Sequence, residues 1–509
     1  MRQLASTAAP ASAANRLVVT PRMLWMLLGA VLLLRLCSLG LYPLMDTSEA
    51  RYAEMARKML AFDNWVTPLF DVGVPFWGKP PLAFWTQALS MKWFGVSEFA
   101  VRLPSWLFHV GSTLIVLRFG REERDTTTGL LAAIIFSSSS LGLVAAGAVL
   151  TDPALGFAVV LASYGFWRGM VHRQTGWALA GFAGLGLGLL AKGPLVGVLV
   201  GAPALFWTLY NRQWRALLHL PWLRGIALMM LIAVPWYVLA EQRTPGFLDY
   251  FLVGEHWKRY VVSGWTGDLY GTAHARAPGS IWPQLLVALF PWSLLLPLLY
   301  FGRKRGAPPR LYVSFLLAWA ATAPLFFTFS ANILWTYALP ALPAISLLLA
   351  DALRGRVVTP GRAGGALAFG GLSLLMPLAL LVAVWEGRVL ERPNNQKPLV
   401  QTWAKLQKDA PGALYYLGKR SYSGEFYSGG SARRFADACA RPPRENFYVV
   451  MRGRGLDVAA TWPGSRRCQA RSQLNSSVLL QCPSLSHAIA ATGTGPAAEA
   501  PLCAVNSPG

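Results

Sequence analysis

Residues 23–54 read MLWMLLGAVLLLRLCSLGLYPLMDTSEARYAE and join a long apolar run to a charged segment directly behind it. The apolar part, residues 23–42, is long enough to cross a bilayer as a helix. The charged part brings Asp46, Glu49 and Arg51 to the edge of the membrane. Because charged groups are costly to hold at a membrane, a functional role is the first explanation to consider for this segment.

Apolar runs of this kind recur along the 509-residue chain, in which 54% of the residues are hydrophobic and 14% are charged. No run alternates as the strands of a membrane barrel do, so the sequence predicts a polytopic α-helical membrane protein. Residues 80–95 are apolar but short, and we expect a juxtamembrane helix on the membrane surface there. The eleven expected transmembrane helices cover residues 23–42, 101–118, 127–150, 153–168, 176–191, 194–210, 222–240, 281–301, 311–329, 334–350 and 364–385.

The distribution of basic residues predicts the orientation. The formal net charge of +23 would suggest nucleic acid as the partner of a soluble protein. Here eighteen basic residues lie in short loops at one end of the expected helices, and the positive-inside rule places that end in the cytoplasm. We therefore expect no nucleic-acid partner, and we place loops 43–100 and 241–280 and the tail in the periplasm. The basic residues are Arg2, Arg16, Arg22, Arg118, Arg121, Arg124, Arg168, Arg173, Arg212, Arg215, Arg224, Arg303, Lys304, Arg305, Arg310, Arg354, Arg356 and Arg362.

The composition changes after the expected transmembrane domain, residues 1–385. Residues 386–490 lack long apolar runs, and YYLG and FYVVMRG are typical of short strands, so we expect a small α/β periplasmic domain. An exterior compartment permits disulfides, and two bridges with three possible pairings are open. Residues 491–509 are rich in Ala, Gly and Pro and predict a disordered tail. The cysteines available for the bridges are Cys439, Cys468, Cys482 and Cys503.

Three carboxylates on the exterior side are candidate catalytic groups: Asp46, Glu49 and Asp152. Asp46 and Glu49 also fit the start of a helix, with Asp46 as N-cap and Glu49 three residues later. Asp152 precedes Pro153 and could likewise cap the next helix. A carboxylate at a helix N-terminus can still bind an acceptor or a cation, so the structural and functional interpretations both stay open.

Four basic residues on the same side are candidate ligands of a lipid phosphate: Arg51, Lys79, Lys192 and Arg259. Lys79 could equally extend its ammonium group to the membrane surface. Lys192 ends an apolar run, where a cation favours the helix dipole in any case. Arg259 lies in an exterior loop, and a guanidinium group suits an anionic ligand. No P-loop, dinucleotide-binding turn or nucleophile elbow is present in a convincing position, so a nucleotide-driven mechanism is not supported.

The order of these motifs resembles a family of membrane enzymes. RYAE at 51–54, KPP at 79–81 and RLPSW at 102–106 are followed by Thr151-Asp152-Pro153, Ala191-Lys192-Gly193, Glu255-His256-x-x-Arg259 and Trp335-Thr-Tyr337. Over residues 20–350 the chain is similar to membrane glycosyltransferases with the GT-C fold. These include the protein O-mannosyltransferases and, more closely, the bacterial aminoarabinose transferases that modify lipid A.

The resemblance implies transfer of a sugar from a polyprenyl phosphate, undecaprenyl phosphate in a bacterium, to a lipid or glycan acceptor at the periplasmic face of the inner membrane. The matched acids would serve the acceptor or a divalent metal, and the basic residues would hold the lipid phosphate. The matched substrate contacts are Tyr52, His256 and Tyr337.

Two positions depart from the family pattern. Close relatives carry acids where this chain has Ser48 and Gly78. The second of those acids belongs to a metal site shared with the residue that His256 matches. His256 and Glu49 therefore stay open as metal ligands, and no cofactor is assigned, although a divalent metal is not dismissed.

The leading hypothesis is a polyprenyl-phosphate-sugar-dependent glycosyltransferase. A protein O-glycosyltransferase and a transporter or flippase for a lipid-linked sugar are the alternatives. A transporter is expected to show internal repeats or polar residues at mid-membrane, and the sequence shows neither. A scaffolding protein would leave the exterior charges without a role.

Overall fold

A computed structural model describes residues 19–263, 265–270, 275–301, 310–357, 363–387, 395–418, 421–435, 445–452, 462–474 and 477–484. The expected tail at 491–509 lies outside these ranges, as do Cys439, Cys503 and the basic residues at 2, 16, 303–305 and 362. The domain boundaries expected from the sequence stay predictions.

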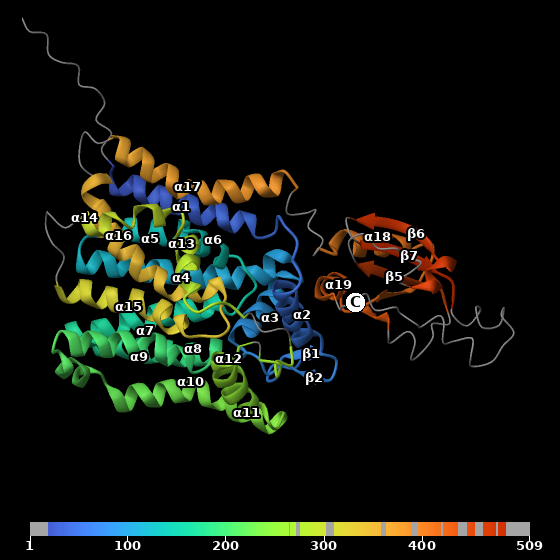
Figure 1. Ribbon diagram of the computed structural model, residues 1–509, viewed down its shortest axis with the longest axis horizontal. Helices are drawn as coiled ribbons and strands as arrows, with labels where there is room; N and C mark the ends of the chain where they lie inside the picture. Colours follow the sequence, from blue (N-terminus) through green and yellow to red (C-terminus); the bar gives the residue numbers. More distant parts are fainter. Residues whose placement is uncertain are drawn as a thin grey trace, which may run out of the picture.

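Long apolar helices form one bundle, in which α17 packs beside α1 at one flank and α10 beside α8 at the other (Figure 1). Seven helices among the described residues are long and apolar enough to cross a membrane. They are α1 (Pro21–Ser38), α4 (Glu98–Glu123), α7 (Asp152–His172), α10 (Trp222–Arg243), α15 (Arg310–Thr328), the 3₁₀ helix η4 (Trp335–Ala341) continued by α16 (Leu342–Val357), and α17 (Ala363–Trp385).

Three further helices of the bundle are shorter or less apolar, so the total of eleven spans stays a prediction. They pack against the long helices, and α7 and α8 form the most extensive helix pair. A short 3₁₀ helix, η1, follows α9. These elements are α5 (Thr126–Ser138), α8 (Thr175–Lys192), α9 (Leu195–Tyr210) and η1 (Trp214–His219).

Two segments expected to be single helices are broken, and that part of the prediction is wrong. In 127–150, α5 ends at Ser138 and α6 (Ser140–Ala145) follows, because Ser139 turns to an extended conformation and accepts the Gly142 N–H at 3.2 Å. Serine hydroxyls that bond to nearby backbone compete with the helix in this way. In 281–301, prolines without an N–H interrupt the helix. The pieces are α13 (Ile281–Leu289), η3 (Trp292–Leu295) and α14 (Leu298–Phe301).

The elements between the long helices gather at one end of the bundle, beside the C-terminal domain (Figure 1). The helix predicted at 80–95 is present as α3 and has only 13 residues, about 20 Å of rise, so it is too short to cross a bilayer. The elements are α2 (Ser48–Ala61), β1 (Leu69–Asp71), β2 (Val74–Pro75), α3 (Leu82–Phe94), α11 (Phe247–Asp249), the π-helical turn η2 (Tyr250–Lys258) and α12 (Arg259–Val261).

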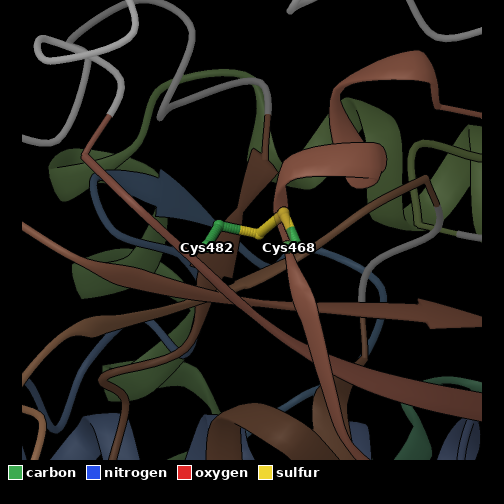
Figure 2. The surroundings of a disulfide bond; sticks show 2 residues. All are labelled: Cys468 and Cys482. Carbon is green, nitrogen blue, oxygen red and sulfur yellow. A yellow bond between two sulfur atoms is a disulfide. The ribbon is translucent and has the colours of Figure 1, made fainter.

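The C-terminal domain is built on a five-stranded sheet with the order β4-β3-β5-β7-β6. β3 runs parallel to β4 and β5, whereas β7 runs antiparallel to β5 and β6. The two strands expected from the sequence are confirmed as β3 and β5. A disulfide joins Cys468 to Cys482 across the β6–β7 hairpin (Figure 2). The bounds are α18 (Lys397–Leu406), β3 (Ala413–Tyr416), α19 (Tyr422–Tyr427), β4 (Arg433–Arg434), β5 (Phe447–Arg452), η5 (Pro463–Arg467), β6 (Gln469–Leu474) and β7 (Ser477–Cys482).

This domain docks on α2 through α19. Tyr422 and Phe426 join the apolar cluster that α2 and α3 form. Lys58 of α2 pairs with Glu425 of α19 at 3.1 Å. The sheet domain is therefore attached to the same end of the bundle that carries the polar motifs.

Candidate functional site

Asp152 and Lys192 form a buried ion pair where two helices meet, with Lys192 Nζ 2.8 Å from Asp152 Oδ1. Asp152 is the first residue of α7 and Pro153 follows it, a favourable way to begin a helix. Lys192 is the last residue of α8, which ends at Gly193 with φ +74°. An acid at a helix N-terminus and a cation at a C-terminus both suit the helix dipoles. The ends of the helices therefore set the pair in place.

The pair lines a small pocket. Tyr337 lies beside it, with Lys192 Nζ 4.7 Å from the centre of the Tyr337 ring. The rest of the wall is mostly apolar. The wall of this small pocket therefore combines an ion pair with apolar side chains. The lining residues are Asp152, Leu155, Lys192, Leu195, Leu199, Phe327, Thr336, Tyr337, Leu339 and Pro340.

A second ion network is centred on Glu255, in the π-helical turn. Lys79 Nζ lies 3.0 Å from Glu255 Oε2, and Arg259 Nη1 lies 3.0 Å from Glu255 Oε1. Arg259 also pairs with Asp268 at 3.1 Å. Burial alone would raise the pKa of the Glu255 carboxyl, but the charges of Lys79 and Arg259 outweigh burial and hold the pKa below its ordinary value.

Two tyrosines and a histidine link the two networks. Tyr52 and Tyr337 lie within electrostatic reach of both Lys192 and Arg259. The His256 Nε2 atom lies 3.0 Å from the backbone oxygen of Lys192. The structure therefore brings together most of the residues that the sequence nominated on the exterior side.

His256 has backbone carbonyls at both ring nitrogens, with Nδ1 2.7 Å from the Phe251 oxygen and Nε2 3.0 Å from the Lys192 oxygen. Burial lowers the pKa of the imidazole, and the two carbonyls oppose this only in part. A metal needs a lone pair on a ring nitrogen, and both directions are taken by oxygen acceptors. The described residues also include no group of three His, Cys, Asp or Glu side chains that could hold a metal. Within the described part of the chain, the surroundings of His256 therefore do not fit a divalent metal.

Arg51 and Tyr52 lie on α2 at the margin of this group. The Arg51 Nη1 atom donates to the backbone oxygen of Tyr270 at 2.5 Å, and its guanidinium carbon lies 5.3 Å from the centre of the Tyr52 ring. Tyr52 packs edge-on against Phe84 at 5.5 Å. The Arg51 guanidinium is thus held by a backbone oxygen, and its role as a ligand of the donor phosphate stays a prediction.

Glu49 lies in a separate arrangement, bound by both sides of the Arg102 guanidinium. Arg102 Nε and Nη2 lie 2.8 Å from the two carboxylate oxygens. Arg102 is fully buried and also donates to the backbone oxygens of Leu39, Tyr42 and Pro43. Glu49 therefore joins the ends of α1, α2 and α4.

Asp46 contacts the C-terminal domain. Its carboxylate accepts hydrogen bonds from the Ser423 N–H at 2.7 Å and the Ser421 hydroxyl at 3.0 Å, and it pairs with Arg452 at 3.1 Å. Burial raises the pKa of Asp46, and Arg452 and the hydrogen bonds offset this only in part. Within the described ranges, no ion pair joins Asp46 or Glu49 to the pocket residues.

Sequence reasoning gave no role to three residues that organise this end of the protein: Glu255, Asp268 and Arg102. Glu255 was visible in its motif, four residues before Arg259, at the spacing of a helical ion pair. Arg102 was visible in RLPSW, but its partner lies 53 positions away in the chain. Asp268 carried no local signal.

Comparison with known proteins identifies relatives over most of the chain. The family described as Dolichyl-phosphate-mannose-protein mannosyltransferase matches residues 23–251. The undecaprenyl phosphate-alpha-4-amino-4-deoxy-L-arabinose arabinosyl transferase 2 of Pseudomonas fluorescens is 32% identical over 369 residues, covering 70% of this chain and 64% of the relative. The corresponding transferase of Pseudomonas savastanoi pv. phaseolicola is 32% identical over 377 residues, covering 71% and 68%. The match thus spans just under two thirds of the first relative.

Two solved structures share the fold. ArnT from Cupriavidus metallidurans bound to undecaprenyl phosphate gives a TM-score of 0.76 at 19% identity, covering 91% of this chain and 98% of that one. The archaeal oligosaccharyltransferase AglB from Archaeoglobus fulgidus gives 0.50 at 14% identity, covering 84% and 69%. Together with the apolar helices, these likenesses identify a multi-pass inner-membrane protein with the GT-C fold and a small C-terminal sheet domain.

Proposed function

Because the chain belongs to the family of undecaprenyl phosphate-aminoarabinose arabinosyl transferases, we propose that it transfers a sugar from undecaprenyl phosphate to an acceptor in the bacterial envelope. The donor named for the relatives is the first to test, with lipid A as the first acceptor. The observation that supports this best is the Asp152–Lys192 pair, which lines a pocket with mostly apolar walls. Through His256, which contacts the backbone oxygen of Lys192, this pair adjoins the Lys79–Glu255–Arg259 network.

In the proposed reaction, the bond between sugar C1 and the phosphate oxygen breaks, and a bond between C1 and the acceptor oxygen forms. Lys79 and Arg259 neutralise the charge that develops on the departing phosphate. Asp152 takes the proton of an acceptor hydroxyl as general base, while its 2.8 Å contact with Lys192 fixes its position. An acceptor phosphate is already ionised, so Asp152 would then only orient it.

We place this site at the periplasmic face, and the C-terminal domain with it. Asp152 begins α7 and Lys192 ends α8, so both lie at the same end of the bundle. The opposite ends of α4 and α16 carry Arg121 and Arg354 in their last turns, and Arg173 follows the last residue of α7. The positive-inside rule favours the cytoplasm for that end.

The direct test uses the purified full chain in lipid vesicles with undecaprenyl phosphate-linked aminoarabinose and lipid A. Mass spectrometry should detect sugar covalently attached to lipid A together with released undecaprenyl phosphate. Arg259→Gln should slow transfer roughly 100-fold, because one stabilising charge on the leaving phosphate is lost. Asp63→Asn, at an exposed residue of the same loop region, should keep the wild-type rate.

Other outcomes would change the proposal. Movement of the donor across the vesicle without covalent transfer would indicate a transporter and overturn it. Transfer to a protein with none to lipid A would keep the reaction but replace the acceptor.

A further inference from the structure

Glu255 is the shared counter-ion of the two cations that the proposed function assigns to the donor phosphate. It contacts Lys79 at 3.0 Å and Arg259 at 3.0 Å. The Glu255 side chain is only 4% exposed, whereas Lys79 is 21% and Arg259 18% exposed. The carboxylate therefore lies behind the two cations, and a ligand approaching from the open side meets the cations first.

The network is electrically balanced before any ligand binds. Asp268 contacts Arg259 at 3.1 Å and is 6% exposed, so two cations face two carboxylates. An anion that binds Lys79 and Arg259 is attracted by the cations and repelled by the carboxylates behind them. Both the attraction by the cations and the repulsion by the carboxylates grow with the charge of the ligand.

The backbone around Glu255 is held in place and its side chain is buried, whereas the cations have long side chains that can turn towards a ligand. A Cβ atom at Gly254 would lie 3.0 Å from the Trp265 ring, so the backbone before Glu255 packs closely on that ring. The next residue, His256, is held by two backbone carbonyls. Lys79 reaches the site on a flexible four-carbon stem. Binding of an anion therefore leaves the Glu255 charge in place.

The substrate and the product of the proposed reaction differ in charge at this position. The donor is a phosphodiester with one negative charge. The released carrier is a phosphate monoester, which carries about −1.5 to −2 at pH 7. A fixed negative charge behind the cations weakens binding of the product more than binding of the donor.

We propose that Glu255 is a specificity-determining residue that discriminates against the spent carrier, so that undecaprenyl phosphate leaves and a new donor binds. This rests on the proposed function, since it takes Lys79 and Arg259 as the phosphate ligands. A purely structural Glu255, which only held Lys79 and Arg259 in position, would affect donor and product alike.

The test measures dissociation constants of undecaprenyl phosphate and of the undecaprenyl phosphate-linked sugar for the full chain in vesicles at pH 7. Glu255→Gln keeps the shape and removes the charge. It should tighten product binding roughly ten-fold and donor binding roughly three-fold. Under multiple turnovers, added undecaprenyl phosphate should inhibit Glu255→Gln more strongly than the wild type, by the same factor as the tightening of product binding. Asp63→Asn removes the same charge at an exposed site and should leave both constants unchanged.

Lys79→Gln separates failure of this inference from failure of the proposed function. If Lys79→Gln leaves both dissociation constants unchanged, the phosphate site itself is misplaced. If it weakens binding but Glu255→Gln leaves the product-to-donor ratio unchanged, the discrimination is absent and Glu255 is a scaffold residue. If Glu255→Gln does not fold, as judged by its thermal midpoint, Asp268→Asn must shift the same ratio in the same direction by a smaller factor, and no shift overturns the proposal.

Discussion

Two pairs of acids at the same end of the bundle differ in what surrounds them. Glu49 and Asp46 lie in the charged stretch behind the first apolar helix. Arg102 binds both oxygens of Glu49, and Arg452, Ser421 and Ser423 bind Asp46. Asp152 and Glu255 lie beside a pocket or between cations that are partly exposed. The difference teaches that charged residues clustered in the sequence can stabilise contacts between elements as readily as they can form a reactive site.

The chemistry of the partner explains part of this contrast. Arginine offers a planar fork of five donors, and Arg102 uses it to fix Glu49 and three backbone oxygens at once. Lysine is a point charge on a flexible stem, so Lys79 can exchange a carboxylate for a ligand phosphate, and Lys192 holds Asp152 without occupying both of its oxygens. Asp152, whose ion-pair partner is a lysine, is therefore better placed than Glu49 to take part in a reaction.

The largest expected effect is on the pocket side of this comparison. Lys192→Met removes the cation and leaves Asp152 without its 2.8 Å partner. We expect transfer to fall by roughly 100-fold or more, since the position of the Asp152 carboxylate as general base depends on this pair. The initial transfer rate per folded molecule in vesicles measures it. A rate within a factor of two of the wild-type rate would show that the Asp152–Lys192 pair is not needed for transfer.

On the other side, Arg102→Leu should affect folding more than chemistry. Arg102 is fully buried, and its removal strands the Glu49 carboxylate and three carbonyls. Breaking such a buried pair costs about 3–5 kcal/mol of unfolding free energy. The thermal midpoint in detergent should fall strongly, whereas molecules that do fold should transfer at close to the wild-type rate. A stable but inactive variant would place Glu49 in the chemistry.

The next effect concerns the sheet of the C-terminal domain. The Cys468–Cys482 bridge closes a loop with a sequence separation of 14 residues. Replacing both cysteines by serine should destabilise the β6–β7 hairpin by about 3 kcal/mol. Hydrogen exchange should rise in β6 and β7 and stay unchanged in α7 and α8. Faster exchange in the transmembrane helices would show that the two regions unfold together.

The smallest effect is a pH dependence of docking at Asp46. Burial raises the Asp46 pKa in the docked state above its ordinary value near 3.8. At a pH between the ordinary and the raised pKa, the docked state therefore binds more protons than the undocked state. Docking should be strongest at the acidic side of that window and weaken as the pH rises through the raised pKa. Limited proteolysis of the C-terminal domain between about pH 4 and 7 measures this. Asp46→Asn should flatten the profile, and an unchanged profile would assign it to another group.

The sequence predicted the helical membrane architecture well, because length and apolarity are properties of single segments. Asp152 and Lys192 could also be predicted from the sequence, since each lies at a helix end next to a proline or a glycine. The partners of Glu49 and Asp46 could not be read in the same way. Arg102 lies 53 positions from Glu49, and Arg452 lies 406 positions from Asp46, so only the folded chain shows that these acids are occupied.

The central claim is that transfer depends on Asp152 and not on Asp46. The most direct measurement compares single-turnover transfer rates of Asp152→Asn and Asp46→Asn in the same vesicles, normalised to folded protein. We expect Asp152→Asn to lose about 10²–10⁴-fold, as for a general base, and Asp46→Asn to stay within about two-fold of the wild type. Full activity in Asp152→Asn, or a comparable loss in Asp46→Asn, would contradict the account.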